Sequence, residues 1–579
     1  MVLDPNSSRQ FVLDVQDFHM FRHRIVELPR LEPLLARATL LQYPPSRQPV
    51  DQGSGGAWDY DDTPPYSVPA RPWINITADD EAISHLVSVF FAWINPTWRF
   101  VEQDLFLQAM RSRNTRSDFC SPLLVNSICA IASLQSEHEL AFAPNNRDRI
   151  GRGQHFHEEA VRLWAKEEYR PSLTNAQALC ILSLDANYRA KDRLGLSLVP
   201  IAVHLNNQMP LHCDEEQYET HDTEKHDFAR VRLSVYWTVI TTHIIMRLAF
   251  MSEMTIKPRS IRHPKINDTF NDEVEMWTAY PFSKSIVPHR PTLYLLERCK
   301  LAILFQEMHD LIFAKTSKAV VNREFMNAVE SLAMKMDQWH QHLPFELQYD
   351  WPMSVAVLEL HASYIAFSMV LRLVARNRCL QDRENAGDSP ESGDSARTAL
   401  DMSRLAQHSL DKALSFAYQA AQALRDFRQR YGLKVTPAWL LQLQAVAASV
   451  LMLDPVLTQP SDNITSPAAA ETLAAESESR TIRDSHTAFD EVFRCLLGSG
   501  VEVMISRGIA RMTYHTALEQ KIELSRSTRT MLKIMSDTAW KPSDLSLLNS
   551  MFPDFTTTKG EDSDGRLTQL LEKWEKLDI

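Results

Sequence analysis

The chain has 579 residues, of which 44 % are hydrophobic and 23 % are charged, and both shares are ordinary for globular proteins. Acidic residues outnumber basic ones by 73 to 61, and the resulting net charge of -12 excludes a molecule whose surface mainly binds nucleic acid. The 14 glycines are roughly a third of the usual ~7 % share. Together with long stretches of 3.6-residue periodicity, this favours an all-α fold, a large bundle-like domain of many helices.

The seven cysteines are scattered along the chain, and no two of them form a C-x-x-C pair. Because a zinc ribbon or a two-zinc cluster needs closely spaced thiolates, we expect free thiols and no zinc bound by this chain. The sequence also lacks a secretory signal and any uninterrupted apolar run of the ~20 residues that a membrane span requires. We therefore expect no membrane association.

The first 74 residues are predicted to precede the main body of the protein. Residues 1–43 contain short helical pieces separated by prolines, whereas residues 44–74 are rich in Pro, Gly and Asp. The latter composition predicts a disordered linker. The helical body is predicted over residues 75–515, and Thr77 is its expected first helix cap because T-A-D-D matches a capping box.

Two further helix starts in the body are predicted from capping residues. Ser121 precedes a proline in the first turn of one helix, and Thr174 precedes apolar positions at helical spacing in another. A third helix, from about Lys225 to Ala249, is apolar on most sides, so we expect it in the middle of the domain.

Three stretches are predicted to lie outside the packed helices. Residues 381–398 and about 459–482 are polar and poor in large apolar residues, which predicts two disordered loops. Residues 516–579 form a tail that mixes acidic residues with Leu, Phe and Trp, including Leu567 and Leu571 on one helix face. Such a tail either folds on a coactivator as an activation segment or docks onto the body, and the sequence leaves both open.

The central stretch carries an ordered set of motifs. It reads S-L-x-x-x-Q-A-L, then two helices ending in L-H, then R-x-R and Y-W. This succession resembles the middle homology region, the fungal-specific transcription factor domain, of fungal binuclear zinc-cluster transcription factors. The matching residues are Ser172, Leu173, Gln177, Ala178, Leu179, Leu211, His212, Arg230, Arg232, Tyr236 and Trp237.

Two features depart from the pattern of that family. The family usually carries an aspartate six residues after the tryptophan and a Gly-Arg-Pro soon afterwards, but this chain has His243 and then Met251-Ser252-Glu253. The six-cysteine zinc cluster that binds DNA in the family is also missing. Zinc is therefore expected only if an upstream six-cysteine cluster exists.

The resemblance implies a nuclear, non-enzymatic transcription regulator that senses a ligand or a partner, with a metabolic gene cluster as one conceivable target. Expected partners are other transcription regulators or coactivators, in a homo- or heterodimer. DNA would be contacted only indirectly or through a missing N-terminal domain, as in a truncated gene model.

A candidate effector pocket is predicted on one face of the most apolar helix. Trp237, Ile240, His243 and Arg247 share this face, and a histidine and an arginine are costly to bury without a partner. An ordinary ion pair or hydrogen bond between helices is the alternative explanation for the two polar residues.

Two other functions remain open. A stand-alone helical co-regulator or scaffold would have the same body but would not bind DNA. A helical enzyme of the terpenoid type would need acidic metal-binding runs such as D-D-x-x-D. The paired aspartates, Asp61-Asp62 and Asp79-Asp80, lie instead in the predicted linker and at a helix start, so this is the remote alternative.

Overall fold

A computed structural model of the chain describes residues 63–143, 148–209, 223–254, 256, 274–283, 286–314, 321–350, 352–387, 393–458, 482, 484–538, 547–556 and 566–575. The described residues are mostly helical, which confirms the predicted all-α class. Within these ranges the strands β1 (Glu275–Thr278) and β2 (Ile286–His289) form one antiparallel pair, in which Glu275 faces His289.

The helices of the first half are α2 (Asp80–Val89), a π-helical turn (Phe90–Ile94), α3 (Asn95–Trp98), α4 (Gln103–Ser112), α5 (Pro122–Ser133), α6 (Gln154–Lys166), α7 (Leu173–Tyr188), α8 (Asp192–Gln208) and α9 (Thr223–Ala249). Those of the second half are α10 (Pro291–Ile312), α11 (Val321–Gln341), α12 (Val355–Gly387), α13 (Gly393–Tyr431), α14 (Ala438–Leu451), α16 (Ser485–Glu502), α17 (Met504–Glu519), α18 (Arg526–Thr538) and α20 (Leu567–Glu575).

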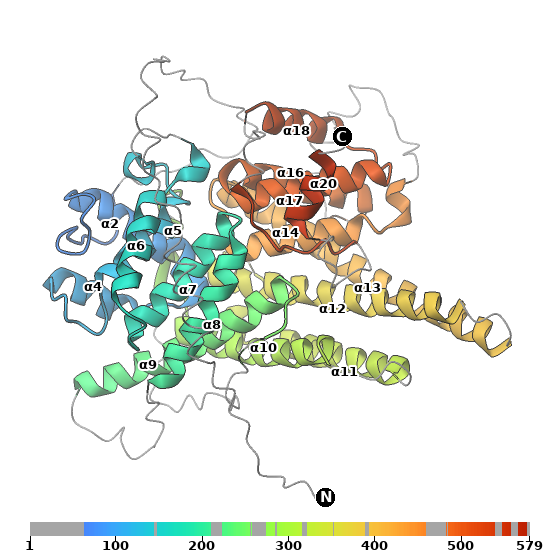
Figure 1. Ribbon diagram of the computed structural model, residues 1–579, viewed down its shortest axis with the longest axis horizontal. Helices are drawn as coiled ribbons and strands as arrows, with labels where there is room; N and C mark the ends of the chain where they lie inside the picture. Colours follow the sequence, from blue (N-terminus) through green and yellow to red (C-terminus); the bar gives the residue numbers. More distant parts are fainter. Residues whose placement is uncertain are drawn as a thin grey trace, which may run out of the picture.

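The helices form two groups that meet along the long helix α12 (Figure 1). Helices α2 to α8 gather on one side, and α14 to α20 gather on the other. Helix α12 packs along α13 and also contacts α14, α11 and α10. Helix α9 runs beneath the first group, where it packs on α10, α8 and α7. One continuous hydrophobic core, which runs from Val68 to Leu571, joins both groups.

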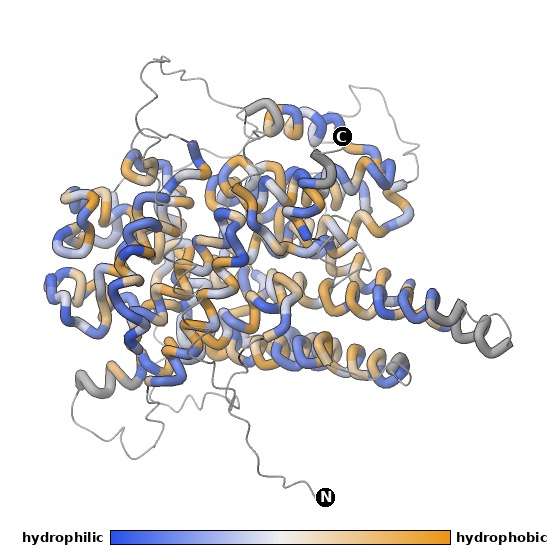
Figure 2. Tube along the Cα trace, viewed as in Figure 1, coloured by the Kyte–Doolittle hydropathy of each residue, from blue (hydrophilic) through white to orange (hydrophobic). Residues whose placement is uncertain are grey.

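Helix α7 shows why the centre of the chain forms the middle of this core. All residues from Leu173 to Tyr188 are buried, so this helix has no solvent-facing side. Helix α14 is similarly apolar and is buried at nearly every position. In Figure 2 the apolar stretches lie mainly inside the molecule, and hydrophilic stretches mark its outer turns. Burial on all sides is the behaviour expected of a helix without a polar stripe.

Helix caps agree with the sequence at one start and correct it at two others. The Ser121 hydroxyl accepts from the backbone N–H of Leu124, as predicted. At α2 the cap is Asp79 and not Thr77, because the Asp79 carboxylate accepts from two first-turn amides at 3.0 Å each. At α7 the cap is Ser172, whose backbone is extended, whereas Thr174 already lies in the helix.

The end of the predicted linker belongs to the core. Residues 1–62 lie outside the described part, but 63–74 are described, and Val68, Ala70, Trp73 and Ile74 are buried. The Trp73 indole N–H also donates to the carbonyl oxygen of Met110 over 2.9 Å. A disordered linker over all of 44–74 is therefore wrong for these residues. Their apolar side chains are spaced among prolines and polar residues, so composition alone hid them.

The predicted loop over 381–398 is also mostly wrong. Helix α12 continues to Gly387 and α13 begins at Gly393, so most of the stretch is helical although it is polar. The two helices form an antiparallel pair that projects beyond the body (Figure 1), where a polar helix needs no buried face. Of the second predicted loop, residues 459–481 and 483 lie outside the described residues, whereas Ile482 is buried.

The C-terminal tail docks onto the body where it is described. Leu567 and Leu571 are buried, and Phe552 packs edge-to-face on Phe250 at the end of α9. Docking was one of the two expectations for this tail, and the packed body therefore extends past residue 515.

Helix α12 contains a stretch, Val355–Glu384, that is long and apolar enough to cross a membrane. In the fold, however, 94 % of its most apolar window is buried inside the protein. Its composition is therefore explained by its place at the centre of the helical body.

Candidate functional site

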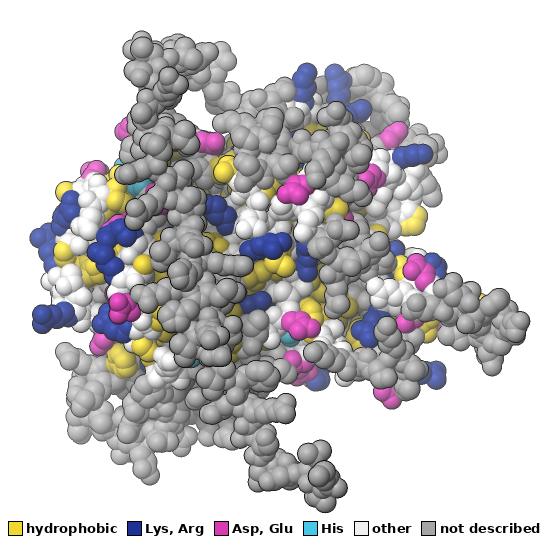
Figure 3. All heavy atoms as spheres, viewed as in Figure 1, with side chains coloured by type: hydrophobic (Ala, Val, Ile, Leu, Met, Phe, Trp, Pro, Cys, Tyr) yellow, Lys and Arg dark blue, Asp and Glu magenta, His cyan; other side chains and the backbone are white. Residues whose placement is uncertain are grey.

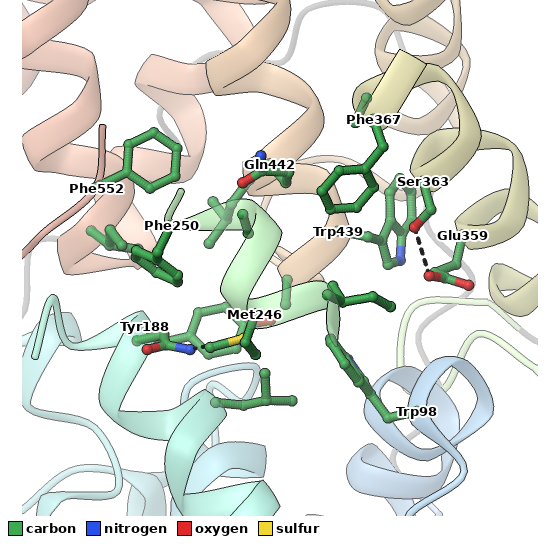
Figure 4. Close-up of a pocket in the computed structure, with 18 of the residues that line it drawn as sticks. Trp98, Tyr188, Met246, Phe250, Glu359, Ser363, Phe367, Trp439, Gln442 and Phe552 are labelled. Atoms are coloured by element: carbon green, nitrogen blue, oxygen red, sulfur yellow. Dashed lines mark hydrogen bonds between the residues drawn. The ribbon is translucent and has the colours of Figure 1, made fainter. Parts of the chain in front are cut away.

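An aromatic cavity lies where the two groups of helices meet (Figure 4). Its walls come from α7 and α9 on one side and from α12, α14 and α17 on the other. Phe552, in the C-terminal segment, also lines it. The space between the lining atoms totals about 720 Å³, including its opening. The aromatic lining residues are Trp98, Tyr188, Phe250, Phe367, Trp439 and Phe552. The part of this space open to the centre of a water-sized sphere is about 80 Å³. Predominantly apolar clefts with a few polar groups are typical of small-molecule sites.

One carboxylate, Glu359, lies in the cavity wall. It is 4 % exposed, and the Ser363 hydroxyl donates to its Oε1 over 2.8 Å. The Tyr294 hydroxyl donates to its Oε2 over 2.7 Å. Burial and the nearby Glu359 charge raise the pKa of the Tyr294 phenol well above its ordinary value, so Tyr294 keeps its proton and acts as a donor.

The guanidinium of Arg298 balances this carboxylate. Its Nε lies 3.9 Å from Oε2 of Glu359, and both side chains are almost fully buried. The same guanidinium stacks on the Trp98 ring at 4.6 Å from the ring centroid and donates to the carbonyl oxygen of Trp98. The cavity wall therefore carries an acidic group whose charge is compensated by a guanidinium that does not itself line the cavity.

Three other polar groups at the cavity lack a hydrogen-bond partner in the structure. These are the indole N–H of Trp439, the amide nitrogen Nε2 of Gln442 and the amide oxygen Oδ1 of Asn187. Each of these atoms is buried. The Asn187 amide nitrogen contacts the sulfur of Met246 at 3.4 Å, and the amide oxygen of Asn187 points away from this sulfur. Unsatisfied buried polar groups are uncommon in native structures and are costly.

The four residues of the predicted effector pocket do share one buried face of α9, but that face does not line this cavity. Trp237, Ile240, His243 and Arg247 are all less than 9 % exposed. The cavity is instead lined from the opposite side of the helix, by Ile245, Met246 and Ala249.

Backbone carbonyl groups contact the two polar residues of the predicted face. Arg247 donates to the carbonyl oxygen of Leu196 over 3.0 Å, and Nε2 of His243 lies 3.2 Å from the carbonyl oxygen of Ile256. Burial, reinforced by the Arg247 charge, lowers the pKa of His243 to about 3, so its ring is neutral near pH 7. Nε of Arg247 and Nδ1 of His243 nevertheless lie buried without a hydrogen-bond partner, so the effector pocket on this face stays a prediction.

The motif residues of α7 have a structural place. The Gln177 amide donates to the carbonyl oxygen of Phe100 over 2.7 Å and is buried. Ala178 and Leu179 lie in the core with no exposed surface. The Gln177 hydrogen bond ties the α3–α4 connection to α7.

The arginines of the R-x-R motif differ from each other. Arg232 is 3 % exposed, and its guanidinium donates to the carbonyl oxygens of Asn206 and Met209 at the end of α8. Arg230 is partly exposed and pairs with Glu102 at 3.3 Å. Leu211 and His212, the L-H pair of the motif, lie outside the described residues.

The C-terminal segment is tied down beside the cavity by polar contacts. Arg566 donates to the carbonyl oxygens of Phe250 and Met551 over 2.8 and 2.9 Å. The carboxylate of Asp192, at the start of α8, accepts from the backbone N–H of Met551 over 2.6 Å. Burial raises the pKa of Asp192 to about 6, although the hydrogen bonds to Met551 and Ser550 partly oppose this shift.

Metal chemistry has little support among the described residues. No group of three or more His, Cys, Asp or Glu side chains there is placed to hold a metal ion. Asp79 caps α2, and Asp80 accepts from the backbone N–H of Ala70, so this aspartate pair has local structural roles. Asp61 and Asp62 lie outside the described residues.

Among the described side chains left uncovered in Figure 3, charge is not concentrated in one patch. Lys and Arg side chains are interspersed there with Asp and Glu side chains, and apolar side chains lie between them. A duplex-binding surface would instead show a basic stripe or patch.

The cavity residues were missed in the sequence for a physical reason. Glu359 was the one available indication, because it is an isolated acid inside a long apolar helix. Trp439 and Phe552 come from distant parts of the chain, and no local spacing links them to α9.

Comparison with known proteins identifies part of the chain. Residues 87–341 match the family described as the fungal specific transcription factor domain. The notoamide biosynthesis transcriptional activator notL' of Aspergillus versicolor is 27 % identical over 337 residues, which cover 58 % of this chain and 52 % of that protein. The nitrogen assimilation transcription factor nit-4 of Neurospora crassa is 23 % identical over 296 residues, covering 48 % and 26 %. The nitrogen assimilation transcription factor nirA of Emericella nidulans is 33 % identical over 115 residues, covering 19 % and 13 %. The chain thus spans about half, or less, of the length of these curated relatives.

Proposed function

We propose that this chain, whose residues 87–341 match the fungal specific transcription factor domain, is a transcription regulator whose helical body responds to a small molecule in the aromatic cavity. The support comes from the matched domain together with relatives named as transcription factors. We place it in the nucleus and assign it no enzymatic activity. The relative named for notoamide biosynthesis supports extending the proposal to genes of a biosynthetic pathway.

The observation that carries the sensing part of the proposal is the position of the cavity. Helices α7 and α9 belong to the matched region, whereas α12, α14, α17 and Phe552 lie after it. A ligand that fills the cavity would therefore contact both groups of helices at once. If it binds one relative arrangement of the groups better than another, it shifts the population toward that arrangement.

DNA contact is proposed to be indirect. The sequence has no closely spaced cysteines for a zinc cluster, and the visible face has interspersed charges. We propose that the regulator reaches DNA through a homo- or heterodimer with another transcription regulator, or through an N-terminal domain outside this sequence. Coactivators are the other proposed partners.

The test is a reporter assay with the whole chain. Residues 1–579 would be fused to a heterologous DNA-binding domain in a fungal host, and transcription from its binding site would be measured. We expect the fusion to change reporter output by several-fold relative to the DNA-binding domain alone. A matched fusion with Ala366→Phe, which fills the cavity, is expected to alter that output at equal protein level. Equal output from all three proteins would contradict the proposal.

A stand-alone co-regulator is the second candidate, and the missing cysteine cluster favours it. Chromatin immunoprecipitation of the chain distinguishes it from a regulator that is recruited to DNA. A scaffold away from DNA would give no enriched sites, even in cells that contain full-length relatives with a zinc cluster.

A further inference from the structure

We propose that the aromatic cavity binds a neutral, flat and mainly apolar molecule that presents a carbonyl oxygen to the buried N–H groups of Trp439 and Gln442. The inference rests on the proposed function, because it specifies the chemical class of the effector.

The walls favour a flat and apolar occupant. Six aromatic rings, each contributed by a different part of the fold, face the same space (Figure 4). Small side chains such as Ala249, Ala366 and Ala438 lie between them and leave room for ring-sized groups. Aromatic rings stack or pack edge-to-face with a planar ligand, and each Å² of apolar surface removed from water contributes about 25 cal/mol.

The unpartnered polar atoms define the hydrogen bonds that the ligand would make. The indole nitrogen of Trp439 is a donor only, its side chain is 6 % exposed, and no acceptor lies within hydrogen-bond distance of it. In Figure 4 this nitrogen lies on the side of the ring nearest Ser363 and Glu359. Nε2 of Gln442 is a second unpartnered donor. A carbonyl oxygen would satisfy these donors, whereas Oδ1 of Asn187 lies against Gly195 on α8.

The charges of the wall select a neutral ligand. Both oxygens of Glu359 already accept hydrogen bonds, from Ser363 and Tyr294, and Arg298 supplies the compensating charge. Trp98 lines the cavity, whereas Arg298 stacks on Trp98 without lining it. An anionic ligand would meet the Glu359 carboxylate without direct access to Arg298. Burial of an unpaired ligand charge would be costly in this setting.

Three fluorescent probes test the proposal on the full chain. Prodan is a neutral, flat ketone, diphenylhexatriene is neutral but has no hydrogen-bond acceptor, and 1-anilinonaphthalene-8-sulfonate is anionic. We expect prodan to bind one saturable site with blue-shifted emission. The anionic probe is expected to bind that site at least tenfold more weakly.

Substitutions then separate the hydrogen bond from the apolar contacts. Trp439→Phe keeps a ring but removes the N–H group, so the affinity for prodan should fall roughly two- to tenfold more than that for diphenylhexatriene. Gln442→Leu removes the second donor at nearly constant volume and should act in the same direction. Trp164→Phe makes the same chemical change as Trp439→Phe on α6, away from the cavity, and should leave both affinities unchanged.

Filling the cavity provides an independent control for variants that fold poorly. Ala366→Phe should abolish binding of prodan while the thermal unfolding midpoint shows that the protein is folded. The inference is overturned if prodan binds equally well to Ala366→Phe, if the anionic probe binds the cavity as tightly as prodan, or if Trp439→Phe and Gln442→Leu weaken both neutral probes equally. Reporter output that fails to change, with probe binding as expected, would instead reject the proposed function and leave the ligand class standing.

Discussion

Arg152 and Glu502 form an ion pair of 2.8 Å between side chains that are 1 % and 7 % exposed, although 350 positions separate them in the chain. Arg149 also donates to the Glu502 carboxylate over 2.7 Å. The pair joins the segment before α6 to the end of α16, so it connects the two groups of helices at a second place besides the cavity. Its contribution can be measured apart from any ligand.

Glu502→Gln is expected to destabilise the protein by about 3 kcal/mol, because it removes the nearer charged partner of the buried Arg152 guanidinium and leaves only Glu137, at 3.6 Å. Urea unfolding followed by circular dichroism would measure this free energy. Glu159→Gln is the matched control, since Glu159 pairs with the half-exposed Arg162 on α6 and such pairs contribute roughly 0 to 1 kcal/mol. Similar losses of unfolding free energy in the two variants would show that the ion pair between the helix groups stabilises the protein no more than the pair on α6.

The Asp192 carboxyl predicts a pH dependence of stability. Its folded-state pKa of about 6 lies above the unfolded value near 4, so the folded protein binds the proton more tightly. This contribution to stability is fully present below about pH 4 and is lost as the pH rises through about 6. The groups that face Asp192 are Met551, Ser550, Arg193 and Arg566, and the hydrogen bonds and charges that they supply are included in the shift.

Asp192→Asn removes this titration while keeping an oxygen that can accept from the Met551 N–H. Relative to this variant, the wild-type protein is expected to lose stability between pH 4 and 6 by an amount of order 2 to 3 kcal/mol. Thermal unfolding of both proteins across this pH range would show the difference. A stability difference that is constant with pH would mean that Asp192 titrates normally.

Arg232→Met is expected to cost about 2 kcal/mol in unfolding free energy, because the carbonyl oxygens of Asn206 and Met209 lose their buried donor at the end of α8. Arg230→Met should cost less than 1 kcal/mol, since the Arg230 side chain is 31 % exposed and its ion pair with Glu102 is partly open to water. Denaturant titrations of the two variants decide the point. If Arg230→Met lowered the unfolding free energy more than Arg232→Met, the contacts of Arg232 with α8 would not explain the R-x-R motif.

Cysteine reactivity gives a further test of the fold. Cys120, Cys129, Cys180, Cys299, Cys379 and Cys495 are buried, and burial raises the pKa of each thiol above its ordinary value. Because the thiolate is the reactive form, these six residues should remain unlabelled by iodoacetamide at pH 8 in the native protein and react fully after denaturation. Peptide mass spectrometry would report each one. Rapid native labelling of Cys129 or Cys180, at the centre of the core, would contradict the packing.

Local chemistry predicted the helices well but their surroundings poorly. Ser121 was recognised as a cap because a proline follows it directly. Thr77 and Thr174 also have a hydroxyl group that can cap a helix, but each lies two residues from the true cap. Residues 63–74 look like a linker by composition, yet the spacing of Trp73 and Ile74 lets them reach α4 and α5. Whether a segment is buried depends on which other segments meet it.

The same limit explains why the aromatic cavity was missed. The sequence placed a candidate pocket on α9 by asking which buried residues need polar partners, and carbonyl groups of neighbouring segments meet only part of that need for Arg247 and His243. The cavity formed on the other side of the same helix, where Met246 and Ala249 give no local indication of a site. The cavity arises because helices distant in sequence meet there, together with Trp98 and Phe552.

The contacts of the C-terminal segment bear on how such regulators can be divided and recombined. Arg566 and Phe552 secure the end of α9, and α9 lies within residues 87–341, the region that comparison recognises. A fragment cut at residue 341 would leave the apolar sides of α7 and α9 in water and would be prone to aggregate. Chimeras between relatives should therefore exchange the whole stretch from residue 63 to 575, since the packed body extends well past the matched residues 87–341.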